Sequence, residues 1–444
     1  MAMMNNTLGV IAEYSKERIS LEDITLETYV TTDNLLQNKQ GKIKADKLPP
    51  NGGNVTKFDF GDILIANIRP YLKKIWLANG CGGSSADVLT LKVNENHDST
   101  FIYYALFRDD FFQHMMNGVK GTKMPRGDKN QVLDFPIPAF NKQKQSEIAK
   151  VLSDLDTKIE LNNKINQQLE AMVKILYDYW FVQFDFPDAG GNPYKSSGGK
   201  MVYDKKLKRE IPVGWEVVTL SDCIKNDKSG DWGKDLEQGN YTQKVSCIRG
   251  ADLNGLNGKG KIKSPTRYIL EKNIHKLLEI NDLIIEMSGG SPTQSTGRLA
   301  FITKETLSRS DNPLICSNFC KAVTLKNPKY LYNFACQWNR LYDAGVLFGW
   351  EGKTSGIKKL LFDSFINNYY VELPKFSVIE NFYKFSKTLH SKKQKNLIEN
   401  DKLEKLRDWL LPMLMNGQVT VKEAQEEIQM NRAAESKAEY KINE

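Results

Sequence analysis

Two long stretches of the chain place apolar residues at alternating steps of four and three positions. The first stretch covers residues 148–180 and the second covers residues 382–413. In both stretches the stepped positions are apolar at the two ends and polar in the middle. A repeat that averages 3.5 residues is typical of helices that pair along a seam. The pattern therefore predicts two long helices, each a rod of roughly 50 Å.

The polar residues in the middle of each seam predict how these helices pair. Asn162 and Asn166 occupy the middle of the first seam, and Lys392, Asn396 and Glu399 occupy the middle of the second. Antiparallel pairing would bring the two polar sets together while the apolar ends pack. Buried polar groups of this kind fix the register of paired helices at some cost in stability. Periodicity alone leaves a second interpretation open, in which each helix lies on its own domain without pairing.

Two shorter apolar runs predict buried strands and belong to a repeat. "FGDILIAN" and "INDLIIEM" each contain an Asp followed by an apolar run, with the length and branching of buried strands. "SLEDI" and "TLSDC" upstream, and "IPAF" and "LPKF" downstream, form further pairs in the same order. The offsets grow along the chain, from 199 (Leu21 to Leu220) to 220 (Phe60 to Ile280) to 236 (Ile137 to Leu373). This pattern predicts one structural unit used twice, with loops of different length.

Each copy of the repeat predicts an α+β domain that ends where a long helix begins. A Gly-rich loop, a short aromatic helix, a basic turn and an X-Pro-x-Phe exit follow the strand in both copies. Asn141 is a suitable N-cap for the first long helix, and Ser377 with Glu380 forms an S-x-x-E capping box for the second. The Gly- and Ser-rich string "DAGGNPYKSSGGK" predicts a linker, and the polar segment after Thr420 is expected to fray. The predicted organisation is a domain over 1–140, a helix over 141–186, a linker and second domain over 187–376, a helix over 377–418 and a polar tail over 419–444.

Composition adds a first indication of partners. The 444 residues carry a formal net charge of +8, and nucleic acid is the first partner that a basic balance suggests, although surplus surface Lys would give the same number. Six scattered Cys without a C-x-x-C pair, together with only four His, favour reduced and mostly buried thiols over a metal site. No apolar leader and no run of about 18 apolar residues is present. These features predict a cytoplasmic protein without a membrane partner.

Five strings of the sequence resemble those of one known family. They are "GTKMPRGDKNQVLDFPIP", "KIELNNKINQQLEAM", "YDYWFVQFDFP", "GGNPYKSSGGKMVYDKKLKREIPVGWE" and "LRDWLLPMLMNGQV". With the layout of two repeated domains and two long helices, they make the chain similar to the DNA-specificity subunit of type I restriction–modification systems. The resemblance covers nearly all of residues 8–418. The segment before Leu21 departs from it, because it does not match the start of the second copy.

The resemblance implies both a fold and a function. The fold would be α+β, with two similar target-recognition domains, each a twisted β-sheet with short helices, separated by two long antiparallel coiled-coil helices in a pseudo-twofold internal repeat. Each domain would read one half of a split, asymmetric site in double-stranded DNA. The helices would set the gap and dock two modification subunits, which would bring S-adenosylmethionine, and restriction subunits would join the larger complex. The chain itself would be non-catalytic and would bind no cofactor or metal.

Other functions require motifs that the sequence lacks. A self-contained DNA methyltransferase, the main alternative, would carry an Asn/Asp-Pro-Pro-aromatic loop, but the Asn-Pro pairs at Asn192, Asn312 and Asn327 lack the second Pro. A P-loop would require Gly in place of Leu347, and a nuclease would require a further carboxylate beside the E-x-K at Glu351. A coiled-coil scaffold that does not bind DNA is a third possibility, which salt-sensitive DNA binding would exclude.

Basic residues beside Gly or aromatic residues are the candidates for DNA contact, because such loops approach phosphates closely. For any one of them a solvated surface charge is an equally good interpretation. The candidates are Arg69, Lys73, Lys74, Lys120, Lys123, Arg126 and Lys129 in the first domain and Arg249, Lys259, Lys261, Lys263, Arg267, Arg298, Lys353, Lys358 and Lys359 in the second.

Overall fold

The chain divides into two compact units, each of which contains one stretch of both long helices. The computed structural model describes residues 5–50, 52–119, 124–289, 293–354 and 357–430. Unit 1 comprises Met1–Glu160 and Asp401–Glu444, and unit 2 comprises Leu161–Asn400. Within the described part of the chain, no helix is both long enough and apolar enough to cross a membrane.

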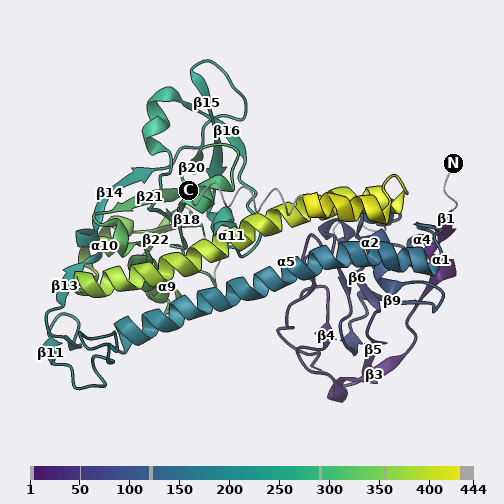
Figure 1. Cartoon of the computed structure of the whole chain (residues 1–444), viewed down its shortest axis with the longest axis horizontal. Coiled ribbons are helices and arrows are strands. Elements are labelled where there is room, and N and C mark those ends of the chain that lie inside the picture. The colour runs from purple at the N-terminus through teal and green to yellow at the C-terminus, as the bar shows by residue number, and fades with distance from the viewer. Residues whose placement is uncertain (1–4, 51, 120–123, 290–292, 355–356, 431–444) are drawn as a thin grey trace. The chain divides into compact units, whose positions relative to one another are not determined.

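Unit 1 contains two four-stranded sheets and a two-stranded one (Figure 1). Its elements are β1 (Asn5–Thr7), α1 (Leu8–Ile11), β2 (Ala12–Tyr14), β3 (Arg18–Ser20), η1 (Leu21–Asp23), β4 (Tyr29–Val30), β5 (Asn54–Phe58), β6 (Ile63–Ala66), η2 (Pro70–Leu72), β7 (Ile75–Leu77), β8 (Gly82–Ser84), β9 (Val88–Val93), α2 (Ser99–Phe107), α3 (Asp109–Asn117), α4 (Lys129–Leu133) and β10 (Pro136–Pro138). The sheet β2-β9-β6-β7 is antiparallel throughout. In the sheet β3-β5-β8-β4, only β4 and β8 run parallel. β1 pairs with β10.

Strand β6 is buried on both faces, which explains its uninterrupted apolar sequence. Ile63 and Ile65 point into a core that includes α2, α3 and the ends of both long helices. Leu64 and Ala66 point the other way, into a smaller cluster with the second sheet. The predicted strand in "FGDILIAN" is therefore confirmed.

Unit 2 repeats the plan of unit 1 and adds two hairpins. Its elements are β11 (Met201–Asp204), β12 (Arg209–Pro212), β13 (Glu216–Thr219), α6 (Leu220–Cys223), β14 (Ile224–Ser229), β15 (Tyr241–Ile248), η4 (Gly250–Asp252), α7 (Leu253–Leu256), β16 (Thr266–Leu270), η5 (Glu271–Lys276), β17 (Asp282–Glu286), β18 (Ser288–Gly289), β19 (Leu299–Phe301), α8 (Lys304–Ser308), β20 (Leu314–Cys316), β21 (Cys320–Leu325), η6 (Pro328–Tyr330), α9 (Leu331–Asp343), η7 (Val346–Trp350), β22 (Glu351–Thr354), β23 (Ile357–Leu360), α10 (Phe362–Asn368) and β24 (Tyr370–Leu373). The antiparallel sheet β14-β21-β17-β19 has the same order of strands along the chain as β2-β9-β6-β7. The fold is therefore α+β with an internal repeat, as the sequence predicts.

The structure corrects the first segment pair of that repeat. "TLSDC" is the short helix α6, which lies between a strand paired with β24 and the first strand of the four-stranded sheet. The same place in unit 1 is held by α1, between β1 and β2, and not by "SLEDI", which forms the 3₁₀ turn η1. Leu8 therefore corresponds to Leu220, and both side chains are buried. Four-residue matches are too short to fix an alignment, and the strand pairing on either side decides it.

The turn that leads into β6 has the same geometry as the turn that leads into β17. The Asp at each turn accepts a hydrogen bond from the backbone N–H three residues earlier, at 2.8 Å for Asp62 and 2.9 Å for Asp282. The residue before each Asp is left-handed, with φ of 87° at Gly61 and 75° at Asn281. Gly and Asn tolerate this conformation better than other residues. The shared turn supports the predicted pairing of these two segments.

The long helices are α5 (Lys142–Tyr177), which continues as a π-helical turn (Asp178–Val182), and α11 (Phe376–Met415). Asn141 caps α5, because its Oδ1 accepts from the N–H of Lys144 at 2.9 Å. The capping box predicted at Ser377 is wrong. Helix α11 already begins at Phe376, and the Glu380 carboxylate forms an ion pair with Lys329.

The segment after Thr420 is also more ordered than predicted. Residues 421–430 are helical. Thr420 and Glu423 form a reciprocal capping box, with Glu423 Oε2 at 2.7 Å from the Thr420 N and Thr420 Oγ1 at 3.3 Å from the Glu423 N. Ala424 is fully buried in the core of unit 1, and Ile428 packs against that core. The expectation of a frayed tail is wrong for these residues, because one helix face is apolar.

Candidate nucleic-acid interface

In unit 1, two loops meet at the end of β6. The N–H of Arg69 donates to the Pro125 carbonyl at 2.8 Å, and the N–H of Gly127 donates to the Asn67 carbonyl at 3.2 Å. A Cβ on Gly127 would lie 2.9 Å from Asn67 Oδ1, so this close approach requires glycine. Arg69 has a left-handed φ of 53° and an exposed side chain. Backbone held this way by two crossing loops is typical of sites that present a side chain to a ligand.

Unit 2 has the equivalent loop contact at the end of β17. The Met287 N–H donates to the Phe319 carbonyl at 2.8 Å, as Asn67 N–H does to Asp87 at 2.9 Å in unit 1. The Met287 carbonyl accepts from the Leu360 N–H at 2.9 Å, as the Asn67 carbonyl accepts from Gly127. In unit 2, however, the incoming segment is the hairpin β22–β23, and β23 pairs with β18 to form a three-stranded sheet. The same strand end thus carries a basic loop in both units.

The predicted basic residues separate into two groups in the described structure. Exposed side chains belong to Arg69, Arg126, Lys129, Lys259, Lys261, Lys263 and Lys359. Among them, Arg126 pairs with Asp87 at 2.9 Å and Lys259 pairs with Glu170 at 2.7 Å. Lys120 and Lys123 lie outside the described residues, and Lys353 is placed in β22 without a described side chain. As DNA contacts, all of these remain predictions.

Six further candidates are bound to groups of their own unit. Lys73 pairs with Asp109 at 2.7 Å, and Lys74 donates to the Thr32 carbonyl. In unit 2, two arginines are held by nearly buried carboxylates: Arg249 contacts Asp252 at 2.8 and 3.1 Å, and Arg298 contacts Glu286 at 2.6 and 3.0 Å. Arg267 is only 8% exposed, with its guanidinium 3.9 Å from the Trp232 ring centroid, and it pairs with Asp235. Lys358 pairs with Glu351 at 3.2 Å. These contacts give the side chains a structural role whether or not DNA is bound.

The carboxylate of Glu351 has partners within its own unit, which give it a structural role. It accepts from the Thr296 N–H at 2.7 Å and from Lys358. The E-x-K string therefore belongs to the hairpin β22–β23, which Glu351 joins to the loop between β18 and β19 through Thr296.

The structure brings the polar middle of the two helix seams together in unit 2. Asn162 donates to Glu399 at 2.8 Å and to Asn400 at 2.9 Å, and Asn396 donates to Asn166 at 2.9 Å. The order of these contacts makes α5 and α11 antiparallel. Lys392 is exposed and does not join them. The contacts on either side involve four residues that seam counting missed. Lys393 pairs with Glu170 at 3.1 Å, and Asn163 accepts from Asn400 at 2.8 Å.

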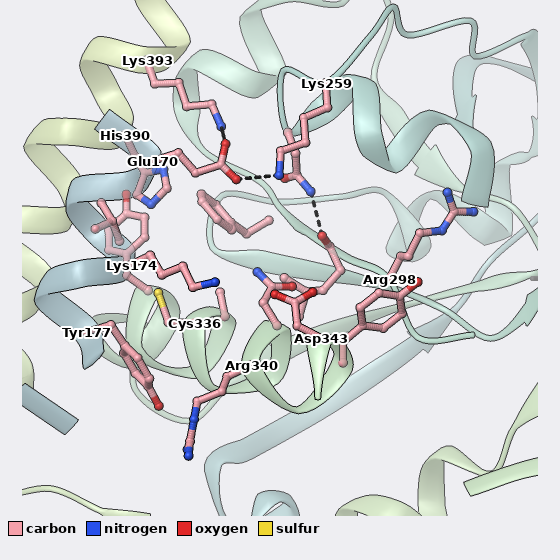
Figure 2. A pocket seen from close by; sticks show the side chains of 18 of the residues that line it. Glu170, Lys174, Tyr177, Lys259, Arg298, Cys336, Arg340, Asp343, His390 and Lys393 are labelled. Atoms are coloured by element: carbon pink, nitrogen blue, oxygen red, sulfur yellow. Dashed lines mark hydrogen bonds and ion pairs between the residues drawn. The ribbon is translucent and has the colours of Figure 1, made fainter. Parts of the chain in front are cut away.

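A pocket of about 480 Å³ lies in unit 2 between α5, α9 and α11 (Figure 2). Glu170 forms one wall, and Lys393 and Lys259 both reach its carboxylate. Burial acts to raise the pKa of Glu170, but the charges of Lys393 and Lys259 outweigh it and hold that pKa below its ordinary value. Glu170 thereby connects both long helices to the loop that follows α7.

Unit 1 fills the corresponding place with an aromatic ring. Counted from the capping residues Asp98 and Asn327, Phe107 of α2 corresponds to Cys336 of α9. Phe107 is buried, and the Arg407 guanidinium lies 4.9 Å from its ring centroid. Cys336 lines the pocket instead. Cys336 thus has a smaller side chain at the position that Phe107 holds in the first copy.

The described structure has two similar sheet-bearing units, each joined to paired long helices and each with a basic loop at one strand end, which is the layout that the sequence resemblance implies. Residues 7–171 match the family described as "Type I restriction modification DNA specificity domain". The resemblance seen in the sequence is thereby confirmed, and the chain is similar to the specificity subunits of type I restriction–modification systems.

Particular relatives and a solved structure agree with this assignment. Over 336 residues, the chain is 26% identical to the Type I restriction enzyme MjaIX specificity subunit of Methanocaldococcus jannaschii, covering 73% of this chain and 70% of the relative. It is 25% identical to the HindI specificity subunit of Haemophilus influenzae over 40% of each chain. The crystal structure of a type I S subunit from M. genitalium has a TM-score of 0.55 at 17% identity, over 93% of this chain and 96% of that one. This last likeness supports the fold.

Proposed function

We propose that the chain is the sequence-specific DNA-binding subunit of a type I restriction–modification complex. Each sheet-bearing unit reads one half of a split site in double-stranded DNA, and α5 with α11 sets the gap between the halves. Two modification subunits dock on the helices and supply S-adenosylmethionine, restriction subunits join the larger complex, and this chain performs no catalysis. The observation that carries the proposal is the strand-end loop contact that recurs in both units at Asn67 and Met287.

The exposed basic side chains at these two loops provide the first test. Arg69 and Lys359 are exposed, and each lies beside the repeated contact. Because a phosphate contact contributes without regard to sequence, Arg69→Ala or Lys359→Ala should weaken binding of the assembled complex by about 1 kcal/mol on any DNA. Each change should also reduce the slope of log affinity against log salt by about one.

The matched control is Lys150→Ala, which removes an exposed Lys of α5 that pairs with Asp154 and lies outside both loops. Affinity and salt slope should stay at their wild-type values in this variant. If Arg69→Ala or Lys359→Ala changed which sequence is bound, the residue would read bases, and the assignment to phosphate would be wrong.

Domain exchange tests whether each unit reads its own half of the DNA site. Replacing residues 1–140 with the same domain of another specificity subunit should change one half of the methylated motif and leave the other half unchanged. The motif is measured in DNA from cells that also carry the modification partner. A swap that altered both halves would show that the units read DNA jointly, and methyl transfer by the isolated chain would refute its non-catalytic role.

A further inference from the structure

Two partly buried ion pairs join α5 to α11, and their charges are arranged in the same way. In unit 1, Arg407 Nη1 lies 2.6 Å from Asp156 Oδ1. In unit 2, Lys393 Nζ lies 3.1 Å from Glu170 Oε2. The basic side chains are only 12% and 8% exposed. In both pairs α5 supplies the acid and α11 supplies the base, and the low exposure makes a mismatch of sign costly.

These pairs are spaced evenly about one contact. Asn400 donates to Asn163 at 2.8 Å. Asp156 and Glu170 lie seven residues before and after Asn163, and Lys393 and Arg407 lie seven residues before and after Asn400. Seven residues are one heptad, so both ion pairs occupy the same position of the antiparallel register.

This symmetry means that like helices could also pair between two copies of the chain. Two α5 helices paired antiparallel about Asn163 would set Asp156 of each level with Glu170 of the other. Two α11 helices paired about Asn400 would set Lys393 of each level with Arg407 of the other. All four contacts would then join like charges, which pairing within the chain avoids.

The neutral contact next to the ion pairs favours the same choice. Asn166 accepts from Asn396 at 2.9 Å, and both side chains are buried. In like-helix pairing, the same spacing would set Asn166 level with Ile159 and Asn396 level with Leu403. Each amide would lose its partner, and a buried amide without a hydrogen bond costs about 1–3 kcal/mol.

We propose that these contacts form a pairing code, which selects α5 with α11 of one chain and rejects a second copy. Such a device suits a chain built from two similar units, because a like helix of a second copy also has a seam with apolar ends and a polar middle. The code is independent of DNA recognition, and its failure would leave the proposed function standing.

The test inverts the code in the full chain. The double variant E170R/R407E makes both contacts within the chain repulsive and all four like-helix contacts attractive. Asn163→Cys reports the pairing, because this position faces itself only when two α5 helices pair. Cys81, which is exposed, is changed to Ser in every chain. Mild oxidation should yield at least fivefold more disulfide-linked dimer on a non-reducing gel from the inverted chain than from the parent.

The matched control reverses all four charges, in the variant D156K/E170K/K393E/R407E. Its contacts within the chain are again attractive and its like-helix contacts repulsive, so its dimer yield should equal that of the parent. Equal yields from the parent and the inverted chain would overturn the proposal, as would a high yield from the control.

A single change keeps the proposal testable if the inverted chain does not fold. Glu170→Arg alone sets opposite charges level with each other in a pair of α5 helices. A pair of α11 helices would still set Lys393 level with Arg407, which repel each other. The dimer yield of Glu170→Arg should therefore rise through Asn163→Cys and remain at the parent level through Asn400→Cys. A rise at both positions, or at neither, would contradict the code.

Discussion

His390 of α11 lies against two aromatic rings, parallel to Tyr332 at a centroid distance of 4.8 Å and edge-on to Phe301 at 4.9 Å. Burial lowers the pKa of His390 to about 3, and the charge of Lys393 acts in the same direction while Glu170 opposes it. A neutral imidazole therefore belongs to the folded state, and the uncharged ring packs against its aromatic neighbours.

This environment predicts a loss of stability in acid. The unfolded pKa of His is about 6.5, so the folded state binds fewer protons than the unfolded state below that value. The contribution of neutral His390 to the free energy of unfolding is complete above about pH 7. It is lost as the pH falls from 6.5 toward 3. The free energy of unfolding should fall by about 1 kcal/mol more between pH 7 and 5.5 in the wild type than in His390→Gln. Urea unfolding at the two pH values measures it, and equal losses in both proteins would contradict the assignment.

Single residues are where the sequence predicted least. Arg267 and Arg298 were selected by the same criterion as Arg69, a basic residue in a stretch with Gly or aromatic residues. In the structure, however, they form ion pairs with Asp235 and Glu286. Those carboxylates are brought close by strand pairing, so no local pattern reveals them. Arg69 is distinguished only by its left-handed backbone and its contact with Pro125, which arise from the fold.

Among the elements, the long helices were the most predictable. The ten stepped positions of the first seam, nine in α5 and Trp180 in the π-helical turn, are all buried or half-buried, because a sustained apolar period leaves one face for the partner. In α11 the count fails by one residue at Phe385 and at Lys392, which are exposed while Ser386 and Lys393 are buried, since an α-helix has 3.6 residues per turn and drifts from a strict 3.5 repeat. S-x-x-E strings were less informative: the one at Ser377 lies inside a helix, whereas T-x-x-E at Thr420 begins one.

Adjacent lysines of α11 test this register. Lys393→Ala removes the buried one of the two lysines that pair with Glu170, leaving Lys259, and should lower the free energy of unfolding by about 1 kcal/mol. Lys392→Ala, one residue away and exposed, should change it by less than about 0.5 kcal/mol. Urea unfolding of both proteins provides the comparison. Equal losses of unfolding free energy in the two variants would show that Lys392 contributes to the helix pairing as much as Lys393 does.

At the scale of the whole molecule, the sequence predicted the class and the repeat but not where the repeat begins. The Asp-led strands could be paired from the sequence because a buried strand imposes a long apolar pattern. The start could not, because α1 and α6 are four residues each and share little beyond Leu8 and Leu220. The pocket beside Glu170 was equally unpredictable, since its lining comes from α5, α7, α9, α11 and the loop before β19, which only the fold brings together.

The central claim is that α5 and α11 set the distance between two separately read half-sites. Seven residues inserted after Asn163 and seven inserted after Glu399 lengthen both helices at the same level. The contacts of Asn400 with Asn162 and Asn163, and of Asn396 with Asn166, keep their register on either side. The added rise is about 10 Å, or roughly three base pairs at 3.4 Å each. The direct measurement is the methylated motif in cells that carry this variant with its modification partner. Both half-site sequences should be retained, with about one to three more unspecified base pairs between them, the range reflecting the rotation of DNA with spacing. An unchanged gap with full methylation would contradict the claim.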